Sequence, residues 1–300
     1  MPSCSACTND AGATRLVDYL WRVQEPDGSW WQNTRVDGTP HWTTEQLDET
    51  ALPIVLAWWL GRTGAADWAH VEPAADYIAA NGPDTGQERW ENQNGWSPNT
   101  IATEIAGLIC AADIARRNGA PGKAEAYERL ADQWQAQVEP WTATTNGPYS
   151  PDPYYLRVTK DADPDDGSTY SLGDNFPRPV DEREIVDNSF LGLVLFGVKP
   201  WDDPVVRNSL SVGDTQLVSD TPSFAVLAIV RRCTDASPPS PEQAWDGRPP
   251  HDEPAGEGTR SATPLAWTHA QFVRLAWSID AGTPIERPAI VACRYTGAEC

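Results

Sequence analysis

Positive charge is scarce in this sequence. Its 22 Lys and Arg residues are outnumbered by 43 Asp and Glu residues, which gives a formal net charge of -21 at pH 7. The basic residues form no block anywhere along the chain. Nucleic acids and anionic membranes are bound through basic surfaces. We therefore expect neither a nucleic-acid nor a membrane partner, and neutral or cationic partners stay open.

Long apolar runs are also lacking. The longest, ALPIVLAWWL at 51–60, has about half the length of a bilayer-spanning helix. The first residues, MPSCSACTND, have neither the basic stretch nor the apolar stretch of a secretory signal. This absence predicts a cytoplasmic protein, or a secreted one if the start of the chain is truncated.

Several motifs for cofactors and nucleophiles are missing. The sequence has no GxGxxG, P-loop or GxSxG pattern, which argues against nucleotide binding and serine-hydrolase chemistry. Its four histidines lack the i,i+4 partner of a metal-binding helix, and Cys4-x-x-Cys7 has no second CxxC or nearby histidine. We therefore expect no metal site and no cofactor. The six scattered cysteines are expected to be mostly reduced.

Tryptophan, by contrast, is abundant, with 15 residues. Packing between large helices is one explanation, but many of these tryptophans lie in polar loops, where carboxylates and amides surround them. An indole ring in such a setting suits stacking on a sugar ring. The composition therefore favours a carbohydrate-binding site. The loop tryptophans are Trp30, Trp31, Trp42, Trp90, Trp96 and Trp245.

Helical hairpins dominate the pattern. Ser97 is a good N-cap, Pro98 suits the first helical position, and apolar residues follow at helical spacing until Asn118-Gly119. The next helix begins at Pro121 after a short connection, which predicts an antiparallel neighbour. Some of the expected helices are apolar nearly all round, and others have one polar, solvent-exposed face. This alternation predicts a helical ring of two layers, with buried inner helices surrounded by amphipathic outer ones. Further helices are expected at 14–24, 45–61, 67–80, 181–197, 222–234 and 264–279.

Residues 140–180 have a different texture. Tyr, Thr, Pro, Gly and Asp replace the helical pattern, and PYYLRV and STYSL are typical of short strands. The segment DADPDDG at 161–167 superficially resembles a calcium loop. Its glycine comes one residue late, and Leu172 stands where an EF-hand has glutamate. We expect a β-rich excursion that contains a solvated turn.

Two glutamates are candidates for acid-base chemistry. Glu91 follows Trp90, and an apolar wall beside a carboxyl group favours its protonated form, as a general acid requires. Glu242 lies in the proline-rich loop 237–258 beside Gln243, where it can stay ionised and activate a water. The alternative for each is an ordinary surface glutamate.

Several longer segments follow one another in order along nearly the whole chain. They are VQEPDGSWWQNTRVDGTPHWTTEQLDE (23–49), QERWENQNGWSPNTIATEIAGL (87–108), WTATTNGP (141–148), YYLR (154–157), DPDDGSTYSLG (163–173), GVKPWDDPVVRNSL (197–210), PEQAWDG (241–247) and SATPLAWTHAQFVRL (261–275). In these segments the chain resembles glycoside hydrolase family 15, the bacterial glucoamylase and glucodextranase type.

The resemblance implies an all-α protein with an (α/α)6 barrel. It also implies an inverting exo-acting hydrolase that releases glucose from the non-reducing ends of α-glucans. Glu91 would be the general acid and Glu242 the general base. The substrate-binding side chains would be Trp42, Gln46, Asp48, Trp90, Trp96, Trp245 and Trp267.

The sequence departs from the family at two places. The helix and Arg-Asp motif that precede the Val-Gln-x-Pro-Asp-Gly segment have no counterpart, and the chain passes quickly from residue 222 to PEQAWDG. We therefore expect residues 1–300 to form one incomplete catalytic domain of undetermined oligomeric state. A catalytically silent remnant that at most binds glucan is the alternative. Another α-glucoside substrate, such as dextran or trehalose, is a further one.

Overall fold

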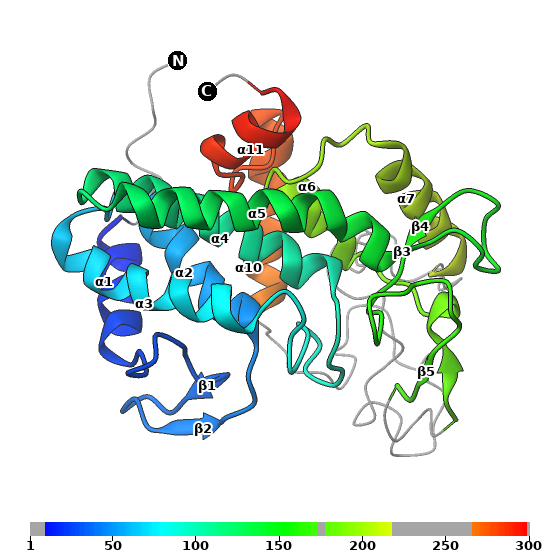
Figure 1. Ribbon diagram of the computed structural model, residues 1–300, viewed down its shortest axis with the longest axis horizontal. Helices are drawn as coiled ribbons and strands as arrows, with labels where there is room; N and C mark the ends of the chain where they lie inside the picture. The colour runs from blue at the N-terminus through cyan, green and yellow to red at the C-terminus, as the bar shows by residue number, and fades with distance from the viewer. Residues whose placement is uncertain (1–9, 173–177, 218–265, 299–300) are drawn as a thin grey trace.

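The computed structural model describes residues 10–172, 178–217 and 266–298, with side chains from residue 270 onward in the last range. These residues form mostly α-helices and three small β-ladders. Long helices cross the middle of Figure 1; one ladder lies below them, and strands of the other two lie toward the right of the view. The predicted helix at 222–234 lies outside the described residues. The rest of the fold is all-α, as predicted.

The central helix is α4, Pro98–Arg117, which is buried along almost its whole length. Ser97 caps it by accepting the N–H of Thr100 at 3.5 Å, and Pro98 occupies its first turn. Gly119 ends the helix region with a φ of 75°, a backbone angle that favours glycine. The predicted helix is therefore confirmed at both ends.

Helix α5, Pro121–Thr142, runs antiparallel to α4, as the short connection predicted (Figure 1). Its inward face buries Tyr127, Trp134 and Val138. Its outer face carries charged side chains such as Glu125 and Arg129, which are exposed. Helix α4 is therefore an inner helix, and α5, with one solvent-exposed face, is an outer helix. The sequence predicted this arrangement of inner and outer helices.

Three further helices complete the first half of the chain. They are α1, Asp10–Arg22, α2, Leu47–Trp59, and α3, Ala65–Asn81. Helix α2 packs closely on α4, because a Cβ at Gly107 would lie 3.1 Å from the Cβ of Ala51. This contact requires glycine or a shift of the two helices. The two helices therefore form the core that carries the site described below.

The prediction of a single helix at 181–197 is wrong. The chain forms β6, Val180–Asp181, two 3-10 turns at Glu182–Glu184 and Ser189–Leu191, and only then the short α6, Gly192–Leu195. The Asp187 carboxylate accepts the backbone N–H and the hydroxyl of Ser189, which forms a local turn. The carbonyl of Ile185 accepts the N–H of Arg157 at 3.0 Å. These competing hydrogen bonds outweigh the apolar helical pattern.

Two helices were not predicted. Helix α7, Pro204–Gln216, begins at Asp203, whose side chain accepts the N–H groups of Val205 and Val206. An aspartate cap followed by proline is a signal that the sequence does contain. The other is α11, Ala289–Thr296, which is joined to α5 by the ion pair of Arg294 with Asp132 at 2.6 Å.

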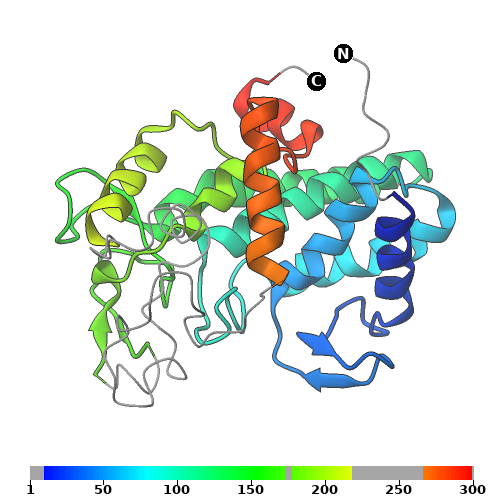
Figure 2. The ribbon, with the colours of Figure 1, turned by 180° about the vertical axis from the view of Figure 1, so that it is seen from behind.

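Helix α10, Ala266–Ala281, confirms the helix predicted at 264–279. It crosses the side of the molecule that is turned away in Figure 1 (Figure 2). Its apolar side chains Phe272, Val273 and Ile279 are between 54% and 71% exposed. Among the described helices, none is long and apolar enough to cross a membrane.

The three ladders are each two-stranded and antiparallel. They pair β1, Asn33–Thr34, with β2, Pro40–Trp42; β3, Ala143–Thr144, with β4, Tyr154–Tyr155; and β5, Thr169–Tyr170, with β6. The last two confirm the predicted β-rich excursion between the helices.

The cysteines only partly follow the prediction. Cys110, in the buried α4, is a free thiol. Cys293, in α11, is disulfide-bonded, so the expectation of mostly reduced cysteines is wrong at this position. Helix α11 packs back onto α4, a long-range contact that residue spacing does not reveal.

Candidate active site

Glu91 lies in the loop between α3 and α4, close to the N-terminal end of α4. Its N–H donates to the carbonyl of Glu88 at 2.7 Å, and its own carbonyl accepts the side-chain amide of Gln87. Its φ of 63° is in the left-handed region. A non-glycine residue there costs roughly 1–2 kcal/mol. The surrounding hydrogen bonds therefore hold Glu91 in a strained conformation.

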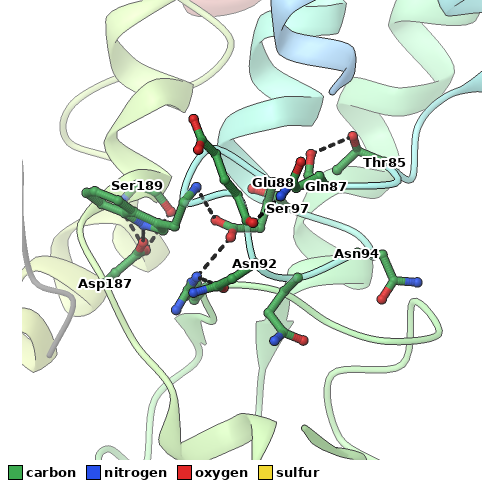
Figure 3. A network of polar contacts seen from close by, with 12 residues as sticks. Thr85, Gln87, Glu88, Asn92, Asn94, Ser97, Asp187 and Ser189 are labelled. Atoms are coloured by element: carbon green, nitrogen blue, oxygen red, sulfur yellow. Dashed lines mark hydrogen bonds and ion pairs between the residues drawn. The ribbon is translucent and has the colours of Figure 1, made fainter. Parts of the chain in front are cut away.

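A buried ion pair stabilises this loop from below. Arg157 donates to Oε1 of Glu88 at 2.8 Å, and the two side chains are 3% and 1% exposed. The same guanidinium nitrogen donates to Asn92 at 2.6 Å, and the other oxygen of Glu88 accepts the N–H of Trp90 (Figure 3). Burial raises the pKa of Glu88, and the Arg157 charge opposes that rise.

The Trp90 side chain anchors the other edge of the loop. Its Nε1 donates to Oδ2 of Asp187 at 2.7 Å, and the Arg89 guanidinium lies 5.1 Å from the ring centre. Figure 3 shows Asp187 and Ser189 beside this loop. The sequence predicted that Trp90 would form an apolar wall beside the Glu91 carboxyl group. In the described part of the chain the Glu91 side chain is exposed instead.

The first turn of α2 brings more carboxylates to the same place. Burial raises the pKa of Asp48 to about 6, and the Arg89 charge opposes it. Burial also raises the pKa of Glu49 to about 9, with the charges of Asp48 and Glu91 acting in the same direction. Gln46 and Asp48 are 5% and 6% exposed, and each has a buried oxygen without a hydrogen-bond partner among the described residues. The predicted residues Gln46, Asp48 and Glu91 therefore share one acidic site.

Glu104 adds a fully buried carboxyl group from the middle of α4. Burial is the main cause that raises its pKa well above the usual value, and the charges of Asp48, Asp84 and Glu45 add to it. Neither of its oxygens has a hydrogen-bond partner among the described residues. The sequence signal for this group is a glutamate within the apolar run IATEIAGLIC.

The other predicted site residues have no contact with this acidic site among the described interactions. Trp42 lies on β2 and is 57% exposed, with the His41 ring in edge contact. Trp96 is half-buried, and its backbone pairs with Thr159 through hydrogen bonds of 2.9 and 3.0 Å. Trp267 lies on α10, whose first side chains are outside the described ones. Glu242 and Trp245 lie outside the described residues altogether.

Sequence reasoning missed the residues that support Glu91. Arg157, Glu88 and Asp187 come from separate segments and meet only in the folded chain. Two of them stand in the predicted strand PYYLRV and in the segment wrongly predicted as helix. An arginine within an apolar strand was the one signal available for this network.

Paired helices in two layers, with carboxyl groups gathered where α2 and α4 begin, define a helical protein with an acidic site at the N-terminal ends of these two helices. The sequence profile of Glycosyl hydrolases family 15 matches residues 25–233. The chain belongs to this family. The resemblance noted from the sequence is thereby confirmed.

Individual relatives agree with this assignment. A glucoamylase from Clostridium sp. (strain G0005) is 37% identical over 331 aligned residues, which cover 94% of this chain and 46% of the relative. The crystal structure of a bacterial glucoamylase complexed with acarbose matches with a TM-score of 0.81 and 34% identity. That match covers 95% of this chain and 48% of the other, and it confirms the (α/α)6 barrel fold class. The chain spans about half the length of these relatives.

Proposed function

We propose that this chain is the catalytic part of an inverting, exo-acting glycoside hydrolase that releases glucose from the non-reducing ends of α-glucans. Family membership gives the hydrolase class. The glucoamylase relative and the acarbose-bound glucoamylase support an oligosaccharide substrate. The observation that carries the proposal is the firm placement of Glu91 on a loop held by Glu88, Arg157 and Asp187.

Glu91 would act as the general acid that protonates the leaving oxygen. Its side chain is open to a ligand, while its backbone is held by hydrogen bonds on both sides. Beside it, burial raises the pKa of Asp48 to about 6 and that of Glu49 to about 9, so this part of the site holds carboxyl groups that retain protons near neutral pH. An acid in a fixed position that the substrate can reach is suited to giving up one proton in each turnover.

Glu242 would activate the water on the opposite face of the sugar. An inverting mechanism requires roughly 6.5–9.5 Å between the two carboxyl groups, which leaves room for that water. Gln46, Asp48 and Trp42 would bind the sugar from the α2 side of the site. Trp90, Trp96, Trp245 and Trp267 would supply the remaining stacking surfaces. No cofactor is needed for this chemistry.

The test is glucose release from maltooligosaccharides, with the anomer of the first product followed by NMR. We expect β-glucose from the parent chain and a loss of at least about 100-fold for Glu91→Gln and for Glu242→Gln, since each removes a proton-transfer group. Glu125→Gln, an exposed change on α5, is the matched control and should keep full activity.

Three results would change the proposal. Activity that survives both substitutions would exclude the assigned residues. Retained glucan affinity without any turnover would favour the catalytically silent, glucan-binding alternative. Release from dextran or trehalose but not from maltooligosaccharides would keep the mechanism and change the substrate.

A further inference from the structure

A second group of carboxylates lies where the turn before β5 meets the end of β6. Asp161 and Asp166 belong to the turn between β4 and β5, and Glu182 follows β6. One oxygen from each of the three lies within 4.8 Å of the other two. The turn was predicted to be solvated, and its two aspartates are indeed exposed. Glu182, by contrast, is brought to them by the tertiary fold.

Strand pairing fixes the position of Glu182. Residues Thr169 and Asp181 are opposite each other in the β5–β6 ladder, and the next N–H along, that of Glu182, donates to the carbonyl of Ser168 at 2.9 Å. Oε2 of Glu182 accepts the N–H of Lys160 at the start of the turn. Both contacts hold the carboxylate against the 161–167 turn.

Glu182 is also buried and incompletely satisfied. The residue is 0% exposed, and its Oε1 has no hydrogen-bond partner among the described residues. A buried carboxylate oxygen left in this way costs several kcal/mol unless a proton or a cation meets it. This oxygen is an independent sign, beyond the clustering of acids, that something is bound at this place.

The neighbouring basic side chains form their closest contacts with other groups. Within the described residues, none of the three carboxylates forms an ion pair. The Lys160 ammonium donates to Asn94 at 2.7 Å, and the Arg183 guanidinium donates to Asp181 at 2.6 Å. Three carboxyl groups therefore converge, and none of them is paired with a basic side chain of the described residues.

We propose that Asp161, Asp166 and Glu182 form a Ca²⁺-binding site that fastens the 161–167 turn to the β5–β6 hairpin. All three donors are carboxylate oxygens. Hard cations such as Ca²⁺ bind such oxygens, whereas transition metals are usually bound by nitrogen or sulfur ligands. Two oxygens that bind one Ca²⁺ at 2.3–2.6 Å lie at most roughly 5 Å apart, so the spacing of the three suits a single ion. Water and turn carbonyls would complete the six to eight ligands that Ca²⁺ takes. Two exposed aspartates on a turn suit the flexible geometry of Ca²⁺ better than the strict octahedral geometry of Mg²⁺.

The site lies beside the support of the Glu91 loop. Lys160, directly before the turn, donates to Asn94, and Gln93 donates to the carbonyl of Ser171 just after β5 at 2.6 Å (Figure 3 shows Asn94). A cation that fixes the turn therefore also fixes contacts to the loop that carries Glu91. The inference does not depend on the proposed catalysis, because ion binding is read directly.

The experiment uses the full chain after chelator treatment and dialysis. CaCl2 and MgCl2 are titrated separately by calorimetry, and the thermal midpoint Tm is followed with each ion. We expect saturable binding of one Ca²⁺, a rise in Tm of roughly 5 °C at about 100 times the Kd, and a weaker response to Mg²⁺. Tb³⁺ luminescence gives an independent readout of the same site.

Matched variants distinguish binding at these three carboxylates from nonspecific attraction of Ca²⁺ to an acidic protein. Asp161→Asn and Asp166→Asn are exposed changes that should leave the fold intact and weaken Ca²⁺ binding at least tenfold. Asp163→Asn, in the same turn but outside the cluster, should bind as the parent does. Glu182→Gln should abolish the response of Tm to Ca²⁺.

Two outcomes overturn the proposal. One is the absence of saturable Ca²⁺ binding by the parent, or equal binding by Asp161→Asn and Asp166→Asn. The other is a Tm that ignores Ca²⁺ in the parent but rises in Glu182→Gln, which would show that the buried carboxyl group holds a proton rather than a cation.

Discussion

The indole nitrogen of Trp90 donates a 2.7 Å hydrogen bond to Oδ2 of Asp187, a residue 97 positions further along the chain. Asp187 is 3% exposed, and its other oxygen accepts two hydrogen bonds from Ser189. This bond connects the Glu91 loop to the irregular segment before α6. The tryptophan next to the candidate acid therefore positions the loop, in addition to any contact it makes with a sugar.

Trp90→Phe is expected to destabilise the protein by about 2 kcal/mol. It keeps the aromatic packing but leaves a buried carboxylate without one of its donors. Urea unfolding followed by circular dichroism measures the change. Trp201→Phe, at a tryptophan that is 70% exposed, is the control and should have almost no effect. Equal stabilities of the two variants would contradict this role of Trp90.

Arg157→Met is expected to cost about 3–5 kcal/mol, because it leaves Glu88 as an uncompensated buried charge. The double variant Arg157→Met/Glu88→Gln removes that charge and should recover more than half of the loss. The free energies of unfolding of the single and double variants test this directly. A double variant no more stable than the single one would show that packing by Arg157, and not its charge, matters.

Glu104→Leu is expected to stabilise the protein by about 1–2 kcal/mol. It replaces a fully buried carboxyl group, whose two oxygens have no hydrogen-bond partner among the described residues, with an apolar side chain of similar size. Glu125→Leu on the exposed face of α5 should change stability by less than about 0.5 kcal/mol. Destabilisation by Glu104→Leu would mean that the carboxyl group has a partner that stabilises the fold.

The stability of the protein is expected to fall as the pH rises from about 5 to 9. The pKa values of Asp48 and Glu49 are raised in the folded state, to about 6 and about 9. The native state therefore keeps protons in this range that the unfolded chain has released, so the unfolding free energy decreases with pH. Asp132, whose pKa is lowered by Arg294, loses its contribution only at lower pH.

Thermal midpoints at unit pH steps measure this slope. Glu49→Gln carries no titrating group at this position, so it should flatten the decline between pH 6 and 9. The curve of the parent and that of Glu49→Gln should converge near pH 5. Parallel curves across the whole range would show that Glu49 does not titrate in this window.

The helices that carry the site were predictable where local signals agree. For α4, the Ser97 cap, the proline after it, the apolar spacing and the terminal glycine all indicate the same segment, and the helix begins and ends there. For 181–197, apolar composition alone favoured a helix. The side chain of Asp187 and the carbonyl of Ile185 instead make contacts that the pattern does not contain.

The sequence by itself determined the all-α class, the paired helices and the family resemblance. These follow from residue periodicity, capping and motifs, all of which act over a few neighbouring positions. Only the tertiary structure decided that Glu88 meets Arg157, that Trp90 meets Asp187 and that Glu182 faces Asp161 and Asp166. These contacts join segments far apart in the chain, and each depends on burial and charge that exist only once the helices and ladders have packed.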